Sequence, residues 1–140
     1  MDTNEAIEKD QASSLRLSPG KSIERPGIDI KGALDRLKVT IEIYKRSLKF
    51  FVKRYPDFIE EVKSALGKNE PNEARKLLHT LRGSAINLGA NEVKEFATKL
   101  GSAIKDGKDD LESLINDLEI ALNTALESMK SFIRERNDGQ

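Results

Sequence analysis

Apolar side chains recur at every third or fourth position from Ile28 onward, and no segment alternates regularly between apolar and polar residues. This spacing is typical of amphipathic helices and argues against a β-sheet. Glycine follows several of the apolar stripes, at positions where it readily ends a helix. The pattern predicts five helical segments: Asp29–Leu37, Val39–Leu66, Pro71–Leu88, Asn91–Asp106, and a last one that opens at Asp109 and fades at Arg134.

The second of these segments contains Pro56, and a proline inside a helix usually kinks or breaks it. The apolar positions keep their helical phase on both sides of Pro56. We therefore expect one long, kinked helix over residues 39–66 rather than two unrelated helices. The last segment opens with Asp109-Asp110-Leu111-Glu112, whose Asp-x-x-Glu spacing resembles a capping box.

Residues 1–27 are rich in serine, proline and glycine and poor in apolar side chains. Such a composition cannot offset the entropy cost of ordering the chain. We expect residues 1–27 to be a flexible tail or linker, residues 28–136 to form one helical domain, and residues 137–140 to be a disordered end. Because short connections make successive helices antiparallel, the expected fold is all-α: an antiparallel up-down four-helix bundle with a short additional N-terminal helix.

Composition excludes several classes of function. Lysine and arginine total 24, as do aspartate and glutamate, and the formal net charge of +0 argues against a general nucleic-acid binder. The absence of cysteine excludes disulfides, thiolate nucleophiles and cysteine-ligated metals. One histidine cannot form a paired-histidine zinc motif, so no metal site is expected. No apolar run is long enough to span a bilayer, and we expect a cytoplasmic location without direct membrane insertion.

The single histidine, His79, falls outside the apolar stripe of its helix. At about 100° per residue, His79 lies about 140° from Ala74 at the centre of that stripe, and Gly83 about 180° from it. Both residues are therefore expected to face solvent. Arg75 and Arg82 flank this outer strip on one edge and Lys76 on the other, so an anion would be favoured beside the imidazole.

Gly83 is unexpected at this position, because glycine inside a helix costs roughly 1 kcal/mol relative to alanine. An exposed glycine is not explained by crowding in the core, whereas a partner that approaches the backbone beside His79 would explain it. Ile86 is an apolar residue on the same outer face, and the partner would cover it. The alternative interpretation is a solvated histidine without a function.

The stretch His79-Thr80-Leu81-Arg82-Gly83-Ser84-Ala85-Ile86-Asn87-Leu88-Gly89-Ala90 resembles the signature of histidine-containing phosphotransfer (HPt) domains. That signature has a hydrophobic residue two positions after the histidine, a basic residue at three and a glycine at four, followed by small residues and a Leu-Gly pair. The resemblance extends from about Ile28 to Ile133. Arg82 is a departure, because lysine is commoner at that position, although both residues are cations.

The resemblance implies that His79 accepts a phosphoryl group from the aspartyl phosphate of a response-regulator receiver domain and passes it to another. Arg82 would then stabilise the developing charge, and Gly83, Lys76, Arg75 and Ile86 would bind the partner. Mg²⁺ and the phosphorylated aspartate would belong to the receiver. Because the chain has no phosphate-binding loop for ATP, it is expected to be a carrier without a cofactor of its own rather than an enzyme.

The partners implied are receiver domains and, as a further candidate, a hybrid sensor histidine kinase. The chain would act either alone or as the cytosolic C-terminal domain of a membrane sensor kinase. Two alternatives remain at this stage. One is a helical adaptor that binds receiver-like partners without phosphotransfer. The other is the phosphoacceptor region of a sensor histidine kinase, which usually has an acidic residue after its histidine and a proline nearby, where this chain has Thr80 and Gly83.

Overall fold

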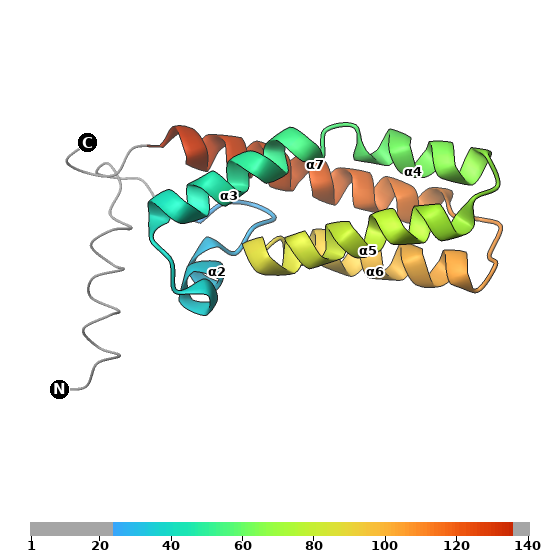
Figure 1. Ribbon diagram of the computed structural model, residues 1–140, viewed down its shortest axis with the longest axis horizontal. Helices are drawn as coiled ribbons and strands as arrows, with labels where there is room; N and C mark the ends of the chain where they lie inside the picture. Colours follow the sequence, from blue (N-terminus) through green and yellow to red (C-terminus); the bar gives the residue numbers. More distant parts are fainter. Residues whose placement is uncertain (1–23, 136–140) are drawn as a thin grey trace.

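The computed structural model describes residues 24–135, and the expected all-α class is confirmed there, with no strand among them. The predictions for residues 1–23 and 136–140 concern residues outside the described range. Figure 1 shows α5, α6 and α7 running side by side with a reversal of direction at each connection, while α3 and α4 follow each other along one flank. The helices are α2 (Ile30–Leu37), α3 (Ile41–Arg54), α4 (Phe58–Gly67), α5 (Pro71–Leu88), α6 (Asn91–Lys105) and α7 (Glu112–Arg134).

The prediction of one long helix over residues 39–66 is wrong, because the chain leaves the helical path at residues 55–57. Pro56 has no backbone N–H, and its ring clashes with the carbonyl of the fourth residue before it, which breaks the helix. Tyr55 and Phe58 are nevertheless both buried, and their rings meet edge to face with centroids 5.4 Å apart. The apolar surface is therefore continuous across the break, which explains why the phase of the sequence pattern survives.

The expected capping box at the start of the last helix is also wrong. The helix begins at Glu112, with Leu111 at the N-cap position and no side-chain cap hydrogen bond. A capping box needs a short polar side chain at the N-cap, three residues before the glutamate. Since Asp109 lies outside the helix, its carboxylate is in the wrong place for that role.

A core of apolar side chains from all six helices holds α5 in place. The helix packs mainly against α6, and also against α4, α3 and α2. The inner stripe of α5 is buried, as the periodicity predicts: Ala74, Leu78, Leu81, Ala85 and Leu88. One face of α5 remains uncovered.

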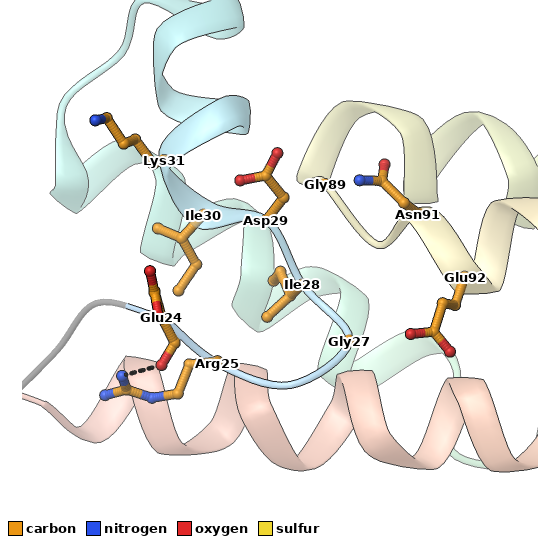
Figure 2. Close-up of a pocket in the computed structure, with 10 residues that line it drawn as sticks. All are labelled: Glu24, Arg25, Gly27, Ile28, Asp29, Ile30, Lys31, Gly89, Asn91 and Glu92. Carbon is orange, nitrogen blue, oxygen red and sulfur yellow. Dashed lines mark hydrogen bonds between the residues drawn. The ribbon is translucent and has the colours of Figure 1, made fainter.

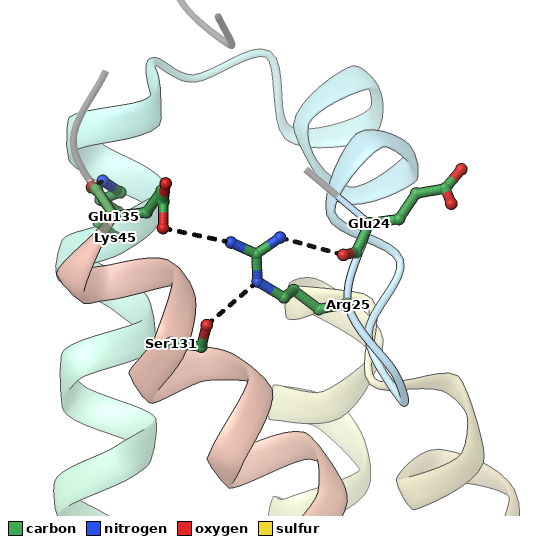
Figure 3. Close-up of polar contacts among 5 residues, drawn as sticks. All are labelled: Glu24, Arg25, Lys45, Ser131 and Glu135. Atoms are coloured by element: carbon green, nitrogen blue, oxygen red, sulfur yellow. Dashed lines mark hydrogen bonds and ion pairs between the residues drawn. The ribbon is translucent and has the colours of Figure 1, made fainter. Parts of the chain in front are cut away.

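Residues 24–29 form a strap that crosses α7 and reaches the turn between α5 and α6 (Figure 2). The hydroxyl of Ser128 donates a hydrogen bond of 2.5 Å to the carbonyl of Pro26. The guanidinium of Arg25 lies against Ser131 Oγ at 3.4 Å and a carboxylate oxygen of Glu135 at 3.8 Å (Figure 3). The last four residues of the segment expected to be flexible, 24–27, are thus packed on α7.

The strap is joined to the end of α5 at Gly89. The backbone N–H of Asp29 donates to the carbonyl of Gly89 at 2.8 Å. Gly89 has a φ of 86°, in the left-handed region that favours glycine, and a Cβ there would collide with the carbonyl oxygen of Asp29. Only glycine combines this helix end with so close an approach of the strap.

Two side chains satisfy further carbonyls at the end of α5, where backbone acceptors lack partners within the helix. Arg36 of α2 donates to the carbonyl of Ile86 at 2.5 Å. The buried hydroxyl of Tyr44 on α3 donates to the carbonyl of Leu88 at 2.7 Å. The C-terminal end of α5 is therefore held from α2, α3 and the strap.

Tyr44→Phe is expected to lower the free energy of unfolding by about 1–2 kcal/mol, because the buried carbonyl of Leu88 loses its donor. Burial, and then the negative charge of Asp29, raise the pKa of Tyr44 well above its usual range. A pKa that is higher in the folded state gives stability that is present below the ordinary tyrosine pKa of about 10 and is lost as the pH rises further. Denaturant unfolding of both proteins at several pH values between 7 and 11 measures both effects.

The matched control for that experiment is Tyr55→Phe, because the hydroxyl of Tyr55 makes no hydrogen bond within the described chain. This control should keep the steep alkaline loss of stability, whereas Tyr44→Phe should show a shallower one. Parallel pH curves for the wild type and Tyr44→Phe would contradict the role assigned to Tyr44.

Candidate functional site

The uncovered face of α5 presents His79 to solvent in the middle of the helix. Leu78, one residue before His79, and Leu81, two residues after it, are buried in the core, which turns His79 outward. The imidazole makes no hydrogen bond or ion pair within residues 24–135. The side chain is thus available to a partner molecule.

Gly83 lies one turn after His79 on the same exposed face. A Cβ added to Gly83 would meet no atom within 4 Å. Packing within this chain therefore does not require glycine here. Ile86 continues the outer face with 36% of its surface exposed.

A groove lies between α5 and α6, and His79 is one of the residues that line it. We call it the cationic groove, because its lining includes four basic side chains and no carboxylate: Arg75, Lys76 and Arg82 from α5, and Lys105 from α6. Its remaining walls are Asn72, Leu78, Thr80, Ala97, Thr98, Gly101 and Ser102. None of the four cations forms a salt bridge within the part of the chain that the structure describes.

The helical positions of the sequence placed Lys76 on the opposite edge of the outer strip from Arg75 and Arg82. The structure brings all three into the cationic groove with His79. Arg75 is partly engaged, since its guanidinium donates to the side chain of Asn72 at 3.4 Å. Gly83 and Ile86 lie outside this groove. Together with His79 they mark the exposed outer face of α5, which we call the exposed ridge.

A second groove lies on the other side of the ridge, between α3 and α5. We call it the apolar groove, because most of its large side chains are apolar. It is lined by Leu37, Ser47, Phe50, Phe51, Arg54, Tyr55, Ser84, Asn87 and Leu88. Phe50 is 71% exposed, more than any other large apolar side chain described. Sequence reasoning missed Phe50, although it falls outside the apolar stripe of its helix, as Ile86 does.

The described residues contain neither a cluster of metal-ligating side chains nor a helix that could span a membrane. Within residues 24–135, no three His, Cys, Asp or Glu side chains gather where they could hold a metal ion. None of the helices there is both long and apolar enough to cross a bilayer.

A family model for the Hpt domain matches residues 46–132, from the middle of α3 to the end of α7. The match covers more than half of the chain and includes the whole of α5 with His79. The chain belongs to the Hpt domain family. Membership implies a phosphorelay role in histidine phosphotransfer, as a carrier rather than as a catalyst with an ATP site.

The fold of this Hpt domain is similar to that of a solved relative. The crystal structure of the HPT domain from the Hpt sensor hybrid histidine kinase from Shewanella aligns with a TM-score of 0.66 and 21% sequence identity. The alignment covers 75% of this chain and 92% of that one. A search of curated proteins gave no significant match.

Proposed function

We propose that this Hpt domain is a phosphorelay carrier in which His79 accepts a phosphoryl group from a receiver aspartyl phosphate and passes it to another receiver. The observation that supports this most is the placement of the family's histidine motif on an exposed helix face, with open backbone at Gly83. The helices would serve as an antiparallel up-down four-helix bundle, with α2 as the short additional helix, and hold that face rigid.

Phosphoryl transfer to His79 requires little from this chain beyond a positioned nucleophile and nearby positive charge. A ring nitrogen of His79 attacks the phosphorus, the bond between phosphorus and the aspartate oxygen breaks, and the carboxylate leaves. Phosphoryl transfer depends mainly on in-line geometry and on stabilisation of negative charge. The guanidinium of Arg82, which lines the same groove as the imidazole, supplies part of that stabilisation, and Mg²⁺ is assigned to the receiver.

The exposed ridge of α5 is the proposed docking surface for the receiver. Gly83 lets the partner approach the backbone, and Ile86 offers it an apolar contact. Lys76 and Arg75 line the cationic groove, where they would attract an acidic site on the partner. The apolar groove adds Phe50, an exposed aromatic of the kind that anchors protein interfaces.

The decisive test is transfer from receivers that carry a radiolabelled aspartyl phosphate. We expect the label to move to this chain from at least one member of a receiver panel, and to be lost in acid, as a phosphorus–nitrogen bond requires. Binding to a receiver without any transfer of label would instead favour the adaptor. An acid-stable label would contradict a phosphohistidine.

A further inference from the structure

We propose that α6 supplies the second half of the phosphoryl site, with Lys105 and Ser102 binding the oxygens of the group carried by His79 in the cationic groove. This inference rests on the proposed function and deepens it. The motif around His79 describes only α5, whereas the groove is built by both helices.

Charge is the first observation in favour. The cationic groove gathers four basic side chains without one carboxylate among its lining residues. Like charges placed together repel one another, so an unneutralised cluster favours an anionic occupant. Lys99, on the same helix but outside this groove, lies 3.7 Å from a carboxylate oxygen of Glu95, so this lysine of α6 is already paired with an acidic side chain.

Space is the second observation. The wall of the groove contributed by α6 includes two of the smallest residues, Ala97 and Gly101. A Cβ on Gly101 would meet no atom within 4 Å, so packing does not require glycine there. Glycine is unfavourable inside a helix. Its presence leaves open volume in the groove that contains His79, where a phosphoryl group can lie.

Hydrogen bonding distinguishes the two hydroxyls that α6 brings to the groove. The hydroxyl of Thr98 donates to the carbonyl of Lys94 at 2.8 Å, so its proton is already used. The hydroxyl of Ser102 makes no hydrogen bond within residues 24–135 and can donate to an added oxygen. Ser102 and Lys105 are therefore assigned to the phosphoryl group, and Thr98 is not.

Phosphoramidate tests this assignment on the full chain without a receiver. A ring nitrogen of His79 attacks its phosphorus, the bond from phosphorus to the amide nitrogen breaks, and that nitrogen leaves as ammonia with a proton. The ³¹P NMR signal of the phosphorylated chain is then followed against pH. A nearby cation favours the dianion of the phosphoryl group, so its loss should raise the midpoint of that titration.

Lys105→Gln is expected to raise the midpoint by about 0.5 pH unit, roughly a threefold change in proton affinity, as one surface cation would produce. Lys105→Arg should keep the wild-type midpoint, because it keeps the charge. Ser102→Ala should move the ³¹P chemical shift. The matched controls Lys99→Gln and Thr98→Val should change neither quantity, and circular dichroism checks that every variant is folded.

Two outcomes would overturn the proposal and can be told apart. If phosphoramidate labels the wild type on His79 but Lys105→Gln titrates as the wild type does, the role of α6 is wrong and His79 remains the acceptor. If the wild type takes no label, or His79→Ala takes as much, then the proposed function fails and the groove assignment fails with it.

Discussion

His79→Ala is expected to reduce phosphotransfer from any labelled receiver to the background of the assay. Alanine has no nitrogen to form the bond to phosphorus, and no other histidine exists in the chain. The fold should be unaffected, because the exposed imidazole has no partner within the described residues, and surface changes of this kind stay within about 0.5 kcal/mol. Transfer is measured by gel autoradiography, and stability by denaturant unfolding.

Further variants at His79 and Arg82 test whether the loss of transfer is specific to the imidazole. His79→Gln keeps a polar side chain of similar size without the nucleophile, and should be equally inactive. Arg82→Lys keeps the cation and should transfer close to the wild-type rate, whereas Arg82→Ala should be slower by about tenfold, as expected for a lost charge near the transferred group. Label retained by His79→Ala would exclude His79 as the acceptor.

Gly83→Leu is expected to slow transfer by at least about tenfold while the protein stays folded. A Cβ at Gly83 would meet no atom of this chain within 4 Å, but a leucine there stands where a receiver must approach the helix. In the folded chain alone, leucine is a better helix former than glycine, and stability should rise by up to about 1 kcal/mol. Slower transfer together with raised stability is a combination that damage to the fold cannot produce.

Gly67→Leu is the matched control, because a Cβ at this helical glycine also meets nothing within 4 Å. Gly67 ends α4, at the end of the molecule remote from the α5–α6 turn (Figure 1). Its replacement should leave transfer unchanged. A wild-type transfer rate for Gly83→Leu would show that the partner does not approach the backbone there.

The exposure of His79 and Gly83 could be predicted from the sequence because it depends on one helix alone. The apolar residues of α5 define its inner face, and helical geometry then places every other position. The break at Pro56 could not be predicted in the same way. Buried aromatic residues on both sides of the turn preserve the phase of the pattern, so periodicity cannot tell a kinked helix from two helices that lie end to end.

The site residues that come from α6 and α3 could not be predicted from the periodicity of α5. Lys105 and Ser102 are ordinary polar positions of α6 in the sequence, and only the packing of α6 against α5 brings them into the groove that contains His79. Phe50 likewise becomes part of the site only because α3 lies beside α5. Helical periodicity gives the inner and outer faces of one helix but does not say which neighbour it meets.

The hydrogen bonds at the C-terminal end of α5 affect which truncated forms of this domain should fold. The family match begins at residue 46, in the middle of α3. A fragment cut there lacks the three groups that hold the carbonyls at the end of the histidine helix: the side chains of Tyr44 and Arg36 and the backbone of Asp29. We therefore expect a fragment that begins at residue 46 to be less stable than one that also contains the strap, α2 and the first half of α3.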